Sequence, residues 1–126
     1  MNSNDSSPNA APLIDFDQLQ SACGGDAALL RELMDMYFGQ ADQIILGLRQ
    51  AIQTGAVAEV NHLAHKLAGS SLACGLSAIV PSLRRMEQGA KAGHLEGADA
   101  SMAEATSALE LLRQAVQDHL RQSQSP

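Results

Sequence analysis

One histidine of this sequence stands where a side chain could carry out nucleophilic chemistry. His65 lies within residues 56–73, where apolar residues recur at the three- and four-residue spacing of an α-helix. At about 100° per residue, Val60 and Leu67 fall on one side of this helix and His65 falls almost opposite them. We therefore expect an exposed imidazole. Exposed imidazoles are largely neutral near pH 7, and a neutral ring nitrogen can act as a nucleophile.

The residues expected around His65 on this outer face are mostly small or apolar and include no Lys, Arg, Asp or Glu, although an ordinary solvent-facing surface is rich in charge. They are Ala58, Asn61, His62, Ala68, Gly69 and Leu72. Glycine within a helix costs about 1 kcal/mol relative to alanine, so Gly69 indicates a point that another molecule approaches closely. We expect this face to dock a protein partner. The alternative is a solvated surface histidine without a role.

Other uses of these side chains are less well supported. His62 and His65 stand three residues apart, a spacing that can bind a metal ion, but two ligands are too few for a site. We therefore expect no metal and no cofactor. Cys23 and Cys74 form no CxxC pair and are expected to be buried or half-buried. The methionines expected to fill the core are Met34, Met36, Met86 and Met102.

The elements that must position His65 are helices bounded by residues that start or stop helices. Asp15 and Asp26 can act as N-caps, Gly55 and Gly75 end two helices, and Pro81 fits only near the start of another. Short loops between four long amphipathic helices predict an all-α fold, an antiparallel up-and-down four-helix bundle with a short additional N-terminal helix. The expected helices span residues 16–22, 27–54, 56–73, 77–90 and 98–121.

The ends of the chain differ in composition from this domain. Residues 1–12 are rich in Ser, Asn, Pro and Ala, which predicts a disordered N-terminal tail. The bundle is expected over residues 13–121, and residues 122–126 are expected to be a frayed C-terminal tail.

Composition excludes several classes of function. The 126 residues carry a formal net charge of -6 without a run of Lys or Arg, so nucleic acid and anionic membranes are poor partners. No apolar stretch is long enough to span a bilayer, and the first residues lack the pattern of a signal peptide. We expect a cytoplasmic protein. Hydrophobic residues make up 45% of the chain and aromatic residues only 2%, which favours packed aliphatic helices.

The run from His65 to Ser71, followed by Gly75, resembles the signature of histidine-containing phosphotransfer (HPt) domains. That signature is His-x-Leu/Ile-Lys-Gly-Ser/Ala with a second glycine ten residues after the histidine. The resemblance extends over roughly residues 14–120 and implies that His65 accepts a phosphoryl group. It also implies that Glu87, twenty-two residues further on, contacts and orients the imidazole.

The sequence departs from the family pattern at Ala68, where the family usually has a lysine that helps to neutralise the phosphoryl charge. Lys91, four residues after Glu87, matches a basic position of the family. Lys66 lies about 100° from His65 on the helix and can substitute only in part. Two further cations of the neighbouring helix that could contribute are Arg84 and Arg85.

The resemblance implies a phosphorelay carrier, which is not an autonomous enzyme. His65 would accept a phosphoryl group from a receiver-domain aspartate and pass it to another. The sequence has no GxxxxGK[ST] loop and no glycine-rich nucleotide lid, so the partner is expected to supply the aspartate and Mg²⁺. The expected partners are the receiver domain of a response regulator, a hybrid histidine kinase, or both, and the chain is expected to be a monomer. The alternative is a degenerate docking module that binds receiver domains or kinases without transfer.

Overall fold

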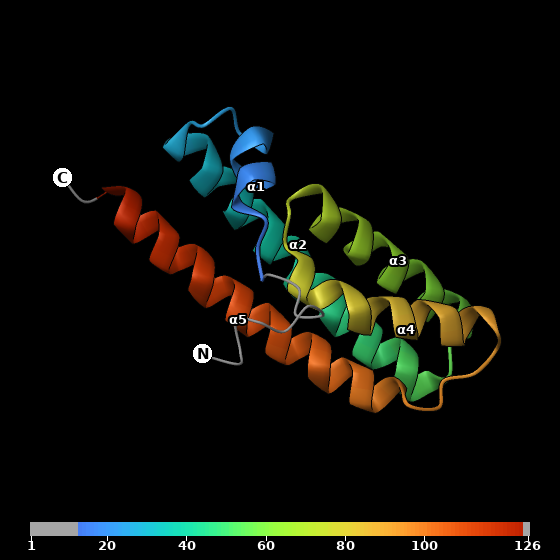
Figure 1. Cartoon of the computed structure of the whole chain (residues 1–126). Helices are drawn as coiled ribbons and strands as arrows, with labels where there is room; N and C mark the ends of the chain where they lie inside the picture. Colours follow the sequence, from blue (N-terminus) through green and yellow to red (C-terminus); the bar gives the residue numbers. More distant parts are fainter. Residues whose placement is uncertain (1–12, 125–126) are drawn as a thin grey trace, which may run out of the picture.

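The described residues of this chain, 13–124, fold into helices joined by short loops (Figure 1). The computed structural model confirms the expected all-α bundle of four long helices, with a short helix before them. A single 3₁₀ turn, η1, leads into the fourth long helix. The elements are α1 (Phe16–Ala22), α2 (Ala27–Thr54), α3 (Val57–Ala73), η1 (Ser77–Ile79), α4 (Val80–Lys91) and α5 (Ala98–Gln124).

The expected caps fix where the first two helices begin and where α2 ends. The Asp15 side chain accepts a hydrogen bond from the backbone N–H of Gln18, and Asp26 caps α2 in the same way. Gly55 ends α2 in the left-handed conformation, with φ of 72°. These three boundaries are therefore confirmed.

Two other boundaries were wrong. The fourth long helix begins at Val80, because residues 77–79 form the 3₁₀ turn and Pro81, which lacks an N–H donor, falls within the first helical turn. The last helix continues to Gln124, so residues 122–124 are helical where a frayed tail was expected. Residues 98–125 contain no glycine or proline that would stop the helix earlier. The expected N-terminal tail, residues 1–12, and residues 125–126 lie outside the described part of the chain.

Helix α3, which carries His65, packs between α2 and α4 (Figure 1). Small side chains allow the close approach of its neighbours: Ala64 and Ala68 are fully buried, as is Ser71. The Tyr37 hydroxyl of α2 lies 2.6 Å from Ser71 Oγ, which donates in turn to the Leu67 carbonyl oxygen. Burial raises the pKa of Tyr37 to about 12. The core therefore holds α3 by a buried polar contact as well as by apolar packing.

Residues of the N-terminal segment form hydrogen bonds with the C-terminal end of α3. The Gln18 side-chain amide donates to the carbonyl oxygens of Leu72 and Ala73, at 2.7 and 3.2 Å. The Asp15 N–H donates to the Gly75 carbonyl oxygen over 2.7 Å. Gly75 has φ of +74°, and a Cβ there would lie 2.6 Å from the Asp15 carbonyl oxygen. This close approach within the chain therefore requires glycine at position 75.

The remaining expectations about the core are mostly confirmed. Cys23 and Cys74 are both buried and form no disulfide. Met34, Met86 and Met102 are buried. The prediction that Met36 fills the core was wrong, because Met36 is 71% exposed. Within residues 13–124, none of the helices combines the length and apolar character that a bilayer crossing requires.

Candidate functional site

His65 lies near the middle of α3 with its side chain 67% exposed, as the helical spacing predicted. Its Nδ1 lies 2.6 Å from Oε2 of Glu87 on α4. An ionised carboxylate can only accept a hydrogen bond, so Nδ1 is the donor and carries a proton. In the neutral ring, Nε2 is then the unprotonated nitrogen, with its lone pair available. The structure thus brings together the two residues that the sequence had paired.

Each of the two carboxylate oxygens of Glu87 accepts a hydrogen bond from a different residue. The Glu87 side chain is 18% exposed, and Oε1 accepts a hydrogen bond of 2.7 Å from Nη1 of Arg84, one turn earlier on α4. Partial burial raises the pKa of the Glu87 carboxyl, but the hydrogen bonds and charges of Arg84 and His65 outweigh this effect and lower the pKa below its ordinary value. Glu87 is therefore a fixed, ionised acceptor for the imidazole.

We expect Glu87 to stabilise the folded chain less as the pH falls. A carboxyl with a lowered native pKa contributes stability above its unfolded-state pKa, here 4.5, and loses that contribution as the pH falls through the native value. Wild type should therefore exceed Glu87→Gln in unfolding free energy by the largest amount at neutral pH, and this difference should shrink below about pH 4. Urea unfolding between about pH 7 and about pH 3 measures it. A difference that stays constant over this range would contradict the assignment.

Two of the six expected docking residues belong to the contact between α3 and α4. Ala68 is fully buried, and Asn61 is half-buried, with its side-chain amide donating to the Glu87 backbone carbonyl over 3.1 Å. Their placement on the outer face was wrong, because α4 packs against the flank of α3 that the helical wheel had left open. Asn61 instead helps to align α4, so that Glu87 reaches the ring.

The other four expected docking residues are exposed beside His65. They are Ala58, His62, Gly69 and Leu72. A Cβ built on Gly69 would meet no atom within 4 Å, and its φ is not positive. The chain's own fold therefore does not require glycine at position 69, in contrast to Gly75. The expected close approach at Gly69 would have to come from another molecule, whereas the one at Gly75 is internal.

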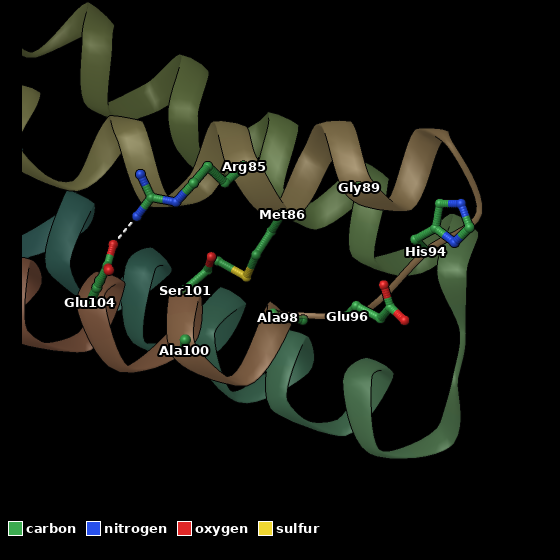
Figure 2. A pocket seen from close by; sticks show the side chains of 10 residues that line it. Arg85, Met86, Gly89, His94, Glu96, Ala98, Ala100, Ser101 and Glu104 are labelled. Carbon is green, nitrogen blue, oxygen red and sulfur yellow. Dashed lines mark ion pairs between the residues drawn. The ribbon is translucent and has the colours of Figure 1, made fainter.

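The lysines that were expected to neutralise the phosphoryl charge form no bond with His65 or Glu87 in the described part of the chain. Lys66 and Lys91 are exposed, and within residues 13–124 no hydrogen bond or ion pair links either of them to His65 or Glu87. Arg85 likewise forms no hydrogen bond or ion pair with His65 or Glu87 in this part of the chain. Figure 2 shows its guanidinium paired with Glu104 of α5, beside a hollow between α4 and α5. Of the cations considered, Arg84 is the one bonded to Glu87.

Sequence reasoning missed an apolar groove between α2 and α3. It is lined by Leu33, Met36 and Gly39 from α2 and by Ser70 and Ala73 from α3. Ala73 lies one turn beyond Gly69, so the groove adjoins the exposed surface around His65. A single exposed methionine off the core stripe of α2 is the sequence signal that could have revealed it.

Comparisons with known proteins agree with this geometry. A sequence model of the Hpt domain matches residues 32–122. The crystal structure of histidine-containing phosphotransfer protein B (HptB) from Pseudomonas aeruginosa PAO1 superposes with a TM-score of 0.82, covering 90% of this chain and 98% of that chain. The two sequences are 21% identical, so this likeness establishes the shared fold. No curated protein matches the chain in sequence.

Proposed function

Because the chain belongs to the Hpt domain family, whose members carry phosphoryl groups in two-component phosphorelays, we propose that His65 is its phospho-accepting residue. The observation that carries the proposal is the exposed imidazole whose Nδ1 donates to Glu87. That bond leaves the Nε2 lone pair free to act as the nucleophile. The chain is a carrier and not an autonomous enzyme, since the donor and acceptor aspartates belong to its partners.

The transfer balances without a separate proton acceptor. The Nε2 lone pair forms a bond to phosphorus, and the P–O bond of the aspartyl phosphate breaks to leave a carboxylate on the receiver domain. The ring keeps its proton on Nδ1 and gains positive charge, which the ionised Glu87 compensates. The reverse sequence of steps passes the phosphoryl group to a second receiver aspartate. The Mg²⁺ that such transfer uses is bound by the receiver in this proposal.

The docking surface combines the exposed residues around His65 with the neighbouring groove. Ala58, Gly69 and Leu72 offer small or apolar contacts, and Leu72 is 43% exposed. Met36 adds an exposed flexible apolar side chain at the edge of the groove. Such a surface suits a transient complex with the receiver domain of a response regulator or of a hybrid histidine kinase. His65 and Glu87 come from one pair of helices, so the carrier needs no second copy and is proposed to act as a cytoplasmic monomer.

A phosphotransfer profile tests the proposal. Receiver domains of the same organism are phosphorylated one at a time and mixed with the chain, and label is followed as an acid-labile, base-stable bond. Uptake from at least one receiver is expected. Binding of a receiver without uptake from any would overturn the carrier proposal in favour of a degenerate docking module. The absence of both binding and uptake would overturn docking as well.

Gly69→Ala is expected to stabilise the chain while weakening its complex with a receiver. The added Cβ meets open space, so the helix should gain about 0.5–1 kcal/mol in unfolding free energy. In the complex, the same methyl group would occupy the place of the approaching receiver surface. Urea unfolding measures the first effect, and titration of a labelled receiver measures the second. An increase in stability with unchanged affinity would show that no partner approaches this point.

A further inference from the structure

The second partner of Glu87 has a consequence for the chemistry of His65. The two carboxylate oxygens are bonded separately, Oε2 to His65 at 2.6 Å and Oε1 to Arg84 at 2.7 Å. The last torsion of a glutamate side chain is otherwise broadly distributed. With both oxygens bonded, the carboxylate can turn only by breaking one of these bonds. Arg84 therefore fixes the direction in which Glu87 accepts the Nδ1 proton.

No other cation considered for this site is placed to take over that contact. Position 68, where the family usually has a lysine, is a fully buried alanine. Arg85 is paired with Glu104 on the opposite side of α4. Among the described residues, neither Lys66 nor Lys91 bonds to Glu87. The positive charge bonded to the orienting carboxylate thus comes from Arg84.

The position of the ring proton decides whether Nε2 can react. A neutral imidazole carries one proton, and the hydrogen bond made by one nitrogen determines which nitrogen holds it. Only the form protonated on Nδ1 leaves a lone pair on Nε2. A carboxylate held in place favours that form continuously, whereas a carboxylate free to rotate favours it for part of the time.

We propose that Arg84 is a positioning residue of this site, which acts through Glu87 to hold His65 as the tautomer whose Nε2 is nucleophilic. The inference rests on the proposed function of His65 and names the group that supports it. Arg84 itself need not touch the phosphoryl group. The Arg84 side chain is half-buried, so packing and hydrogen bonding must be separated experimentally.

The test compares Arg84→Met with Arg85→Met. Methionine keeps an unbranched stem and removes the guanidinium, and Arg85 offers the same substitution on the neighbouring residue, away from His65. The ring nitrogen chemical shifts of ¹⁵N-labelled His65 report its tautomer in the free protein. Single-turnover transfer from a saturating phosphorylated receiver reports the chemical step, and a titration reports Kd.

Arg84→Met is expected to lower the population of the Nδ1-protonated form and to slow transfer about tenfold, the lower end of the loss that follows removal of an outer-shell partner of a metal-bound histidine. Its Kd for the receiver should stay at the wild-type value. Arg85→Met should match wild type in all three measurements, and Arg84→Lys should restore most of the tautomer population and rate. If Arg84→Met does not fold, Arg84→Ala with Arg85→Ala as its control serves the same comparison.

The possible failures are distinguishable. An unchanged tautomer population or an unchanged transfer rate in Arg84→Met would overturn the role of Arg84 and leave the carrier function standing. Equal losses of tautomer population and transfer rate in the Arg84 and Arg85 variants would also overturn the role of Arg84, since such losses would reflect surface charge alone. Absence of label on the wild-type chain would instead overturn the proposed function, and the tautomer measurement does not depend on that result.

Discussion

His65→Gln protein is expected to take up no acid-labile phosphoryl group from any receiver domain. The amide nitrogen of glutamine has its lone pair delocalised and is not a nucleophile, so the acceptor is lost outright. The fold should survive, because the side chain at position 65 is 67% exposed and, within residues 13–124, forms a hydrogen bond with Glu87 alone. We expect the unfolding free energy to change by about 1 kcal/mol or less. The measurement is label retained on the chain after mixing with a phosphorylated receiver.

His62→Gln is the matched control for this prediction. His62 is exposed on the same helix, about one turn before His65, so the same substitution removes an imidazole from the same surface. Uptake by this variant should continue because His65 is present, although the loss of a docking contact at His62 can weaken binding of the receiver. Label that persists on His65→Gln would show that another group accepts the phosphoryl, and loss of label from both variants would point to docking as the shared cause.

Gly75→Ala should lower the free energy of unfolding by about 2–4 kcal/mol. An L-residue at a φ of +74° costs about 1–2 kcal/mol, and the added Cβ would lie 2.6 Å from the Asp15 carbonyl oxygen. The N-terminal segment would have to move, and the hydrogen bond from the Asp15 N–H to Gly75 would be weakened, at a cost of about 1 kcal/mol. Urea unfolding at neutral pH measures the total.

Gly55→Ala separates the two contributions. Gly55 has nearly the same φ, +72°, but a Cβ there would meet no atom within 4 Å. Its substitution should therefore show only the backbone strain, about 1–2 kcal/mol. Equal losses in the two variants would mean that the contact with Asp15 contributes nothing to stability.

The features that could be predicted from the sequence are those set by local geometry. The caps at Asp15 and Asp26 depend on side chains that bond to backbone within three residues, and both were predicted correctly. The exposure of His65 follows from its angle to the buried stripe of its own helix. Its pairing with Glu87 came from the resemblance to a family, since twenty-two residues along the chain carry no local geometric constraint.

The features that could not be predicted depend on how neighbouring helices are placed. A helical wheel assigns one buried face, but α3 is flanked on two sides, so Ala68 and Asn61 were assigned to the wrong surface. Met36 is a different case, because it lies off the apolar stripe of α2 and its exposure could have been predicted from the wheel. The groove beside it could not, because it exists only when α2 and α3 are packed together. The spacing of Arg84 and Glu87, three residues apart on one helix, allows their pairing. The division of the two carboxylate oxygens between Arg84 and His65 depends on how α3 and α4 pack together.

The attachment of α1 to the end of α3 bears on how the helix that carries His65 can open. Native proteins unfold locally in cooperative units, and the ends of helices usually open at low free energy. Here the last carbonyl oxygens of α3 accept hydrogen bonds from Gln18, and the Asp15 N–H donates to Gly75 just beyond the helix. Fraying of α3 from this end therefore first requires α1 to detach. The rate at which amide hydrogens around His65 exchange with solvent would then be governed by a segment about fifty residues away along the chain.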